Sequence, residues 1–177
     1  MSATRQQLAF AVLGLLGLTL AGCGFQLRGY ELDANVQSFA ITGMTRAQVV
    51  APLKRALQQA GAEEVAQSEA NVVVALLDQR SERRSVSTAG QARVAEYEID
   101  YAVQYQLLGG DGTELTPTTW IERQRIYRLD RGNIVGSSEE QALLQREMLQ
   151  DVVGQIVRAM DLVSRQAVSA DPVPDAT

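Results

Sequence analysis

The sequence predicts an α+β fold (α/β in the broad sense), a two-layer sandwich of two helices packed on one face of a four-stranded mixed sheet. Three patterns predict it. Residues 71–77 form a valine-rich apolar run, and residues 95–107 alternate between apolar and polar side chains. Residues 149–163 carry apolar side chains at helical spacing. These patterns are typical of a buried strand, a half-exposed strand and an amphipathic helix.

Two short apolar runs predict the first strands. Residues 36–41 are closed by Thr42-Gly43, and we expect the first strand there. Residues 71–77 predict a second strand that is buried on both faces, because the run is continuously apolar after its first residue. This strand passes into the polar stretch 78–88, and residues 89–91 mark a turn.

A helix is expected between these two strands. Thr45 and Gln48 stand in capping-box spacing, where each side chain can satisfy an unpaired backbone N–H. Apolar residues follow at helical spacing over 53–60, and Gly61 is a suitable end. Pro52 leaves the start open, since it either kinks this helix or occupies the first turn of a helix that begins later.

The alternation over 95–107 predicts a long strand with one face in the core. Gly109-Gly110-Asp111-Gly112 is typical of a tight hairpin connection, and residues 118–129 form the fourth strand. Both sides of that strand carry apolar and polar residues, so the sequence does not show which side faces the core.

The loop length decides which side chains of the hairpin meet. A loop of two or four residues places Arg123 and Arg125 opposite Glu98 and Glu96, where each cross-strand pair contributes about 0.2–1 kcal/mol. A slip of one residue moves every side chain to the other face and removes these pairs.

The last helix is expected to open at residues 137–140, with Ser137 and Glu140 in capping-box spacing. Its apolar stripe consists of Leu149, Val152, Val153, Ile156, Met160 and Val163. The polar, proline-containing tail 169–177 is expected to be disordered.

The N-terminus carries the pattern of a bacterial lipoprotein signal. Arg5 supplies a positive charge, an apolar stretch follows, and Leu20-Ala21-Gly22-Cys23 gives small residues before the chain's one cysteine. We expect cleavage after residue 22 and a diacylglyceryl group on the thiol of Cys23. The alternatives are an ordinary cleaved signal with a chance cysteine, or an uncleaved anchor. Acyl chains contribute about 0.8 kcal/mol per buried methylene, so several of them anchor firmly.

The remaining chain is long enough for one compact domain. We divide it into a lipid anchor and tether (residues 23–35), a sandwich domain (36–168) and the tail. Gly24 follows the cysteine, whereas lipoproteins similar to this one are usually retained in the inner membrane when that residue is Asp. The outer membrane is therefore expected.

Composition excludes several function classes. The chain has no histidine, which removes Ser-His-Asp and Cys-His catalysis and the commonest transition-metal ligand. The net charge of −5 argues against generic nucleic-acid binding, which needs a basic surface. We expect no enzyme activity, no metal site, and no cofactor beyond the covalent lipid on Cys23.

The chain resembles the LptE family of lipopolysaccharide-assembly lipoproteins. The resemblance rests on residues 20–29 (Leu-Ala-Gly-Cys-Gly-Phe-Gln-Leu-Arg-Gly), on Gly90-Gln91 followed by Ala95-Glu96-Tyr97, and on the order of the elements. It implies an outer-membrane lipoprotein that sits as a plug inside the β-barrel LptD, helps that barrel to fold and binds lipopolysaccharide, without catalysing a reaction.

The resemblance also implies that basic residues near the strand ends contact lipopolysaccharide phosphates. The candidates are Arg83, Arg84, Arg93, Arg128 and Arg131. For any one of them the alternative is a solvated or ion-paired strand residue. Residues 136–138 carry no basic side chain, where some relatives have one. The alternative function is a lipid-anchored periplasmic ligand-binding or inhibitor module without a barrel partner.

Overall fold

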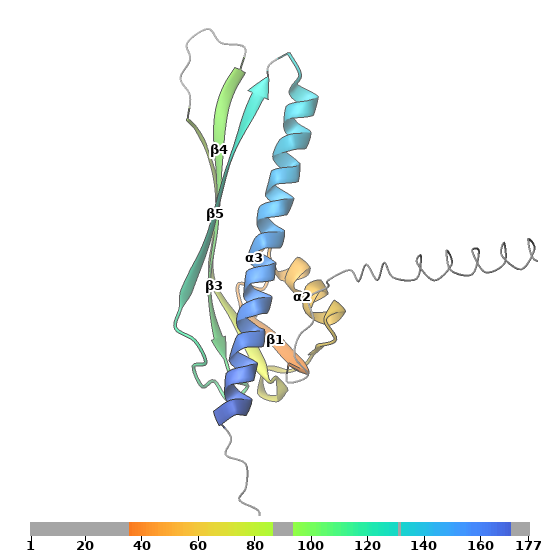
Figure 1. Cartoon of the computed structure of the whole chain (residues 1–177), viewed down its shortest axis with the longest axis vertical. Coiled ribbons are helices and arrows are strands. Elements are labelled where there is room, and N and C mark those ends of the chain that lie inside the picture. The colour runs from red at the N-terminus through yellow and green to blue at the C-terminus, as the bar shows by residue number, and fades with distance from the viewer. Residues whose placement is uncertain (1–35, 87–93, 131, 171–177) are drawn as a thin grey trace, which may run out of the picture.

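The computed structural model describes residues 36–86, 94–130 and 132–170 (Figure 1). The elements are β1 (Ser38–Gly43), α2 (Val50–Gln59), β2 (Glu63–Glu64), η1 (Gln67–Glu69), β3 (Val72–Ser85), β4 (Val94–Leu108), β5 (Thr119–Asp130) and α3 (Ile134–Ala170). The sheet order is β2-β1-β3-β4-β5. β1 runs parallel to β2 and β3, whereas β3, β4 and β5 are antiparallel.

The predicted sandwich is confirmed, with one strand more than predicted. Both helices lie on the same face of a mixed sheet, and the core fills the space between the layers (Figure 1). The fifth strand, β2, has two residues that pair with β1 at its edge. Both are exposed glutamates, so the sequence contains no apolar pattern that could reveal this strand.

The predicted cap of the first helix is wrong. α2 begins at Val50, and the residue before it has no side-chain cap of its own. The backbone N–H of Val49 instead donates to Oε1 of Gln79, 3.3 Å away on β3. Pro52 lies in the first turn, where the missing N–H costs nothing. Gln79, distant in sequence, therefore accepts the backbone N–H at the start of α2, the role that was expected of the Thr45 and Gln48 side chains.

β3 is twice as long as predicted. It has fourteen residues and continues through the polar stretch to Ser85, with a bulge at Leu77. Pairing with β4 continues on both sides of the bulge, so tertiary contact overrides the low strand propensity of charged residues. The predicted turn at 89–91 lies outside the described residues.

The alternation predicted for the long strand is confirmed. In β4, Ile99, Tyr101, Val103, Tyr105 and Leu107 are all buried and face the helices. The connection to β5 is longer than a tight hairpin. A turn at 109–112 is present, but Leu115 and Thr116 then donate their N–H groups to the carbonyl of Leu107 before β5 begins.

This loop sets a register that removes the predicted cross-strand ion pairs. Arg123 lies opposite Tyr101 and Arg125 opposite Ile99, on the helix-covered face. Both arginines contact α3 instead. Arg123 donates to Oε1 of Gln155 at 2.6 Å, and Nη2 of Arg125 lies 3.4 Å from Oδ2 of Asp151. The arginines therefore fasten β5 to the helix.

α3 begins one turn earlier than predicted. Asn133 accepts the N–H of Gly136 at 3.1 Å and caps the helix. Ser137 is buried within the first turn, where its hydroxyl accepts the N–H of Asp130, so the Ser137–Glu140 capping box is wrong. The predicted stripe is confirmed, except that Leu149 is half-buried and Met148 is fully buried.

Several predictions fall at the chain ends. α3 runs to Ala170, two residues into the predicted tail, and the rest of that tail lies outside the described residues. The predicted signal peptide and tether also lie outside them. We call the end of the sheet at Ser85, Asp130 and the start of α3 the distal end; α2 lies toward the opposite end (Figure 1).

Replacement of Gln79 tests its role as a remote cap. Gln79→Ala leaves the Val49 N–H and the Tyr101 hydroxyl without their shared acceptor. We expect the free energy of unfolding to fall by about 1–3 kcal/mol, measured by urea denaturation. Gln124→Ala, at an exposed position of β5, is the matched control and should change stability by less than about 0.5 kcal/mol. Equal effects would refute the cap.

Candidate functional site: the open face and the distal end

Strand alternation leaves one face of β3, β4 and β5 without a helical cover, and we call it the open face. Its members are the even-numbered residues of each strand beyond the bulge in β3. They are Asp78, Arg80, Glu82 and Arg84 of β3, Glu96, Glu98, Asp100, Ala102 and Gln104 of β4, and Trp120, Glu122, Gln124, Ile126 and Arg128 of β5. Positive and negative side chains are mixed across it.

Arg84 and Glu98 form the most buried ion pair of the open face. Glu98 is only 8% exposed, and its carboxylate accepts a hydrogen bond from the Arg84 guanidinium. Oδ2 of Asp100 lies 3.6 Å from Nη2 of the same arginine. The hydrogen bond to Glu98 and the charge of Asp100 raise the pKa of Arg84. This guanidinium is therefore committed to two carboxylates of its own chain.

Arg128 is also paired. Its Nε donates to Oε1 of Glu96 at 3.1 Å, directly across the ladder between β4 and β5. The Arg128 side chain is 75% exposed and the Glu96 side chain 40%, so the pair contributes little free energy. Its position nevertheless neutralises the charge of Arg128 near the distal end.

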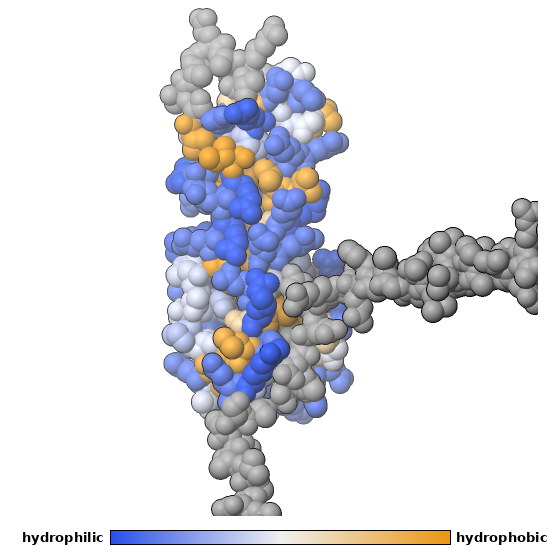
Figure 2. All heavy atoms as spheres, in the orientation of Figure 1, coloured by the Kyte–Doolittle hydropathy of each residue, from blue (hydrophilic) through white to orange (hydrophobic). Residues whose placement is uncertain are grey.

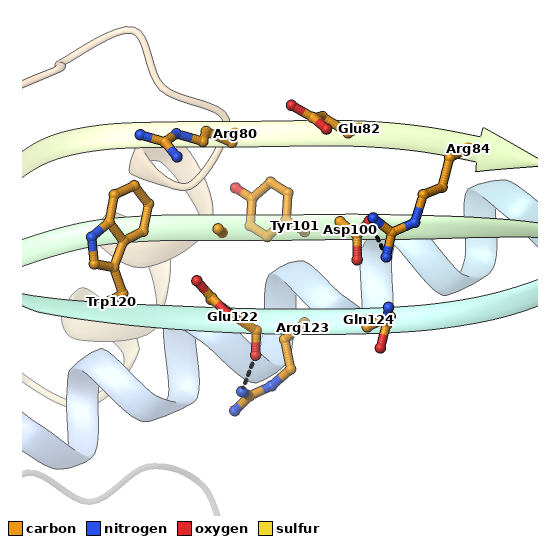
Figure 3. Close-up of a pocket in the computed structure, with 10 residues that line it drawn as sticks. Arg80, Glu82, Arg84, Asp100, Tyr101, Trp120, Glu122, Arg123 and Gln124 are labelled. Atoms are coloured by element: carbon orange, nitrogen blue, oxygen red, sulfur yellow. Dashed lines mark hydrogen bonds and ion pairs between the residues drawn. The ribbon is translucent and has the colours of Figure 1, made fainter.

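Arg80 and Trp120 border a shallow hollow in the open face (Figure 3). The Arg80 guanidinium carbon lies 4.7 Å from the centre of the Trp120 ring, a cation–π distance. Asp78 pairs with the same guanidinium at 2.8 Å. The hollow has a volume of about 540 Å³, and Glu82, Asp100 and other polar side chains line much of it. It suits a polar partner surface better than an apolar ligand.

Arg83 lies on the opposite face from Arg84, because adjacent strand residues point in opposite directions. Its guanidinium stacks 5.0 Å from the Tyr97 ring centre. It donates to the Tyr127 hydroxyl at 3.4 Å and to Oε1 of Gln141 at 3.5 Å. Both hydrogen bonds are long. Within the described residues no carboxylate forms an ion pair with Arg83.

The structure therefore separates the predicted arginine candidates. Arg84 and Arg128 lie on the open face and pair with carboxylates, whereas Arg83 lies on the helix-covered face and has no carboxylate partner among the described residues. Arg93, Arg131 and the lipidation candidate Cys23 lie outside the described residues. Sequence reasoning missed the surroundings of Arg83. The available signal was that Tyr97 and Tyr127 occupy odd-numbered positions of their strands, the same side as the core residues. They lie directly opposite each other, with stacked ring centres 5.8 Å apart.

Exposed apolar side chains gather near the distal end. Val86 is 44% exposed, Ile126 59%, Ile134 63% and Val135 70%. Figure 2 shows apolar spheres close to this end on an otherwise largely polar surface. The distal end therefore combines an unneutralised guanidinium with apolar surface.

A second, smaller hollow lies beside α3 on the helix-covered face. It measures about 280 Å³ and is lined in part by Ser81, Ile99, Tyr101 and Leu149. The Tyr101 hydroxyl donates to Gln79 at 3.1 Å. Burial raises the pKa of Tyr101 to about 12, and burial also raises the pKa of Tyr105.

The part of the chain that the structure describes holds no group of three or more potential metal ligands placed to bind an ion. Among the helices of that part, none combines the length and the apolar character needed to cross a membrane.

Comparisons with known proteins agree with each other. A family model described as "LptE: Lipopolysaccharide-assembly" matches residues 34–160. The LPS-assembly lipoprotein LptE of Pectobacterium atrosepticum is 27% identical over an alignment of 169 residues, and the match covers 88% of this chain and 86% of that protein.

Solved structures show the same fold. An uncharacterized lipoprotein B from Nitrosomonas europaea is 25% identical with a TM-score of 0.68, covering 84% of this chain and 97% of that one. The rare lipoprotein B from Shewanella oneidensis is 23% identical with a TM-score of 0.61, covering 73% of this chain and 98% of that one.

Alkaline pH tests the burial of Tyr101. Its pKa is about 12 in the folded chain and about 10 when unfolded, so the folded state holds the proton more tightly. Stability is therefore unaffected below pH 10 and falls as the pH rises from about 10 to about 12, by up to about 2–3 kcal/mol from this group. Urea denaturation at pH 8, 10 and 11 measures this fall in the free energy of unfolding. Tyr101→Phe should flatten this slope, and an unchanged slope would contradict the assignment.

Proposed function

Because this chain belongs to the LptE family of lipopolysaccharide-assembly proteins, we propose that it plugs the outer-membrane β-barrel LptD and binds lipopolysaccharide during delivery to the cell surface. Its role as a lipoprotein of lipopolysaccharide assembly follows from the family and from the curated relative. The barrel, the ligand contacts and a lipid anchor on Cys23 in the outer membrane belong to the proposal. No catalysed reaction is part of it.

The partners of Arg83 carry the ligand-binding part of the proposal. A guanidinium offers five N–H donors in a planar fork that matches phosphate. Arg84 and Arg128 already donate hydrogen bonds to carboxylates, and the negative charge of those carboxylates also repels a phosphate. Among the described residues, Arg83 makes two long hydrogen bonds to neutral groups and no ion pair, so toward these residues it keeps its charge and spare donors.

The distal end suits an amphiphilic ligand. Lipopolysaccharide joins phosphates and sugars to acyl chains, so its site needs cationic and apolar groups side by side. Arg83 supplies the cation, and exposed residues such as Val86, Ile134 and Val135 supply apolar surface at the same end. Arg93 and Arg131 belong to the segments that follow β3 and β5 in the chain, and they remain candidates for further phosphate contacts.

The open face suits the wall of a barrel lumen. The interior of large outer-membrane barrels is polar. The open face presents charged and amide side chains across three long strands, with Ile126 as an exposed aliphatic member near the distal end. Arg80, Arg84 and Arg128 each pair with a carboxylate of the same face, so a polar wall need not supply their counter-charges.

Replacing single arginines tests the ligand contact. Because Arg83 and Arg84 lie on different faces, they must be replaced separately. Arg83→Ser should weaken lipopolysaccharide binding by roughly tenfold, the effect of losing one charge-assisted hydrogen bond of about 1.5 kcal/mol. Binding of labelled lipopolysaccharide to the lipidated full chain in detergent measures the dissociation constant.

Arg128→Ser is the matched control, since it removes the same charge from the same end. Its charge is already neutralised by Glu96, so binding should change less than twofold. Circular dichroism checks that both variants fold. If Arg128→Ser weakens binding as much as Arg83→Ser does, or if neither changes it, the assignment of Arg83 is wrong.

A further inference from the structure

One edge of the sheet is unpaired over the distal half of β3. β1 pairs with β3 only from Val72 to Leu76 and ends at Gly43. Beyond the bulge, β3 pairs with β4 on one side, and no strand among the described residues pairs with it on the other. Residues 80–85 are exposed. An unpaired edge of this length presents backbone N–H and C=O groups to any strand that fits it.

The charge order along this edge is self-complementary. Asp78, Arg80, Glu82 and Arg84 alternate in sign and all lie on the open face. If a second copy pairs antiparallel with this edge about a two-fold axis at Ser81, Arg80 faces Glu82 of the second copy. Asp78 then faces Arg84 of the second copy, and this contact would add to the pairs that Asp78 forms with Arg80 and Arg84 with Glu98 in each chain. Directly opposite residues in an antiparallel pair are close enough for such charges to interact.

Neighbouring registers are repulsive. Moving the axis to Arg80 places that arginine opposite itself and Asp78 opposite Glu82. Moving it to Glu82 places that glutamate opposite itself and Arg80 opposite Arg84. Both alternatives put like charges face to face, which destabilises strand pairing. Axes at Gln79 or Arg83 also pair opposite charges, but each forms only two such contacts. The axis at Ser81 forms four, so the charge order favours the register around Ser81.

The other long edge of the sheet lacks this property. β5 carries Arg123 and Arg125 on one face. An axis at Gln124 places these two arginines opposite each other, and an axis at either arginine places it opposite itself. Self-pairing is thus disfavoured in the middle of β5 and favoured on β3.

We propose that two copies of this chain associate through the distal edges of β3, in an antiparallel pairing centred on Ser81 that joins their sheets. The inference concerns the free protein and does not rest on the barrel or on lipopolysaccharide binding. Because the contact consists of a short strand and exposed ion pairs, the dimer should dissociate on dilution and at high salt.

Charge reversal and charge exchange test the register. The full lipidated chain is purified in detergent, and its oligomeric state is measured by light scattering across a range of concentrations. Glu82→Arg should give a monomer, since it faces Arg80 of the second copy. Arg80→Glu combined with Glu82→Arg should restore the dimer, because the exchange recreates opposite pairs. Glu122→Arg, an equal charge change on the open face of β5, should leave the dimer intact.

A cysteine at the axis provides a second readout. Ser81→Cys places two thiols directly opposite each other, within the Cα distance that a disulfide needs. Mild oxidation should link the copies of this variant and leave the parent chain, with Cys23 alone, unlinked. A parent chain that is monomeric at every concentration would overturn the proposal. So would a Glu82→Arg variant that dimerises like the parent, or a Ser81→Cys variant that does not cross-link.

Discussion

The antiparallel pairing of β4 with both of its neighbours is the constraint on which the rest of the structure depends. β4 pairs with β3 and with β5 over most of its fifteen residues. Its odd-numbered side chains build the core against the helices, and its even-numbered side chains form the middle of the open face. Once β4 is fixed, the position of every arginine in β3 and β5 follows from register. A shift of one residue on either side would exchange the two faces.

The sequence predicted those elements whose stability comes from their own apolar pattern. The alternation of β4 and the stripe of α3 are strong because one face of each is buried. The resemblance to the LptE family was confirmed by the family model. β3 beyond Leu77 was not predicted, because its charged residues are held as a strand by pairing with β4 rather than by burial. The starts of both helices were missed for a related reason. The first turn of α2 is held by Gln79 of β3, and that of α3 is capped by Asn133 rather than by Ser137.

The candidate site also depends on strand pairing that the sequence does not reveal. Sequence reasoning placed Arg83 and Arg84 together. Adjacent positions of the strand hold one guanidinium that pairs with Glu98 and one that, within the part of the chain the structure describes, contacts neutral groups. Register also decided the fate of Arg123 and Arg125, which contact α3 instead of β4. Composition identifies arginines as phosphate ligands, whereas only the pairing of strands shows which of them keep their charge available.

The two faces and one edge of the sheet thus have different roles. The helix-covered face builds the core and holds Arg83 near the distal end. The open face presents charged and amide side chains to a polar wall, and the unpaired edge of β3 presents a self-complementary charge order. A lipid-anchored module without a barrel would need the core but would give the open face no partner.

Affinity purification tests the barrel partnership most directly. A C-terminally tagged, lipidated chain carrying a photo-activated cross-linker at Gln124 is purified from outer membranes after illumination, and mass spectrometry identifies what accompanies it. We predict a single large β-barrel protein in nearly equal amount, cross-linked through the open face. Purification without any barrel would contradict the plug function and favour the module without a barrel partner. A barrel that is present but never cross-linked at Gln124 would contradict the placement of the open face against its wall.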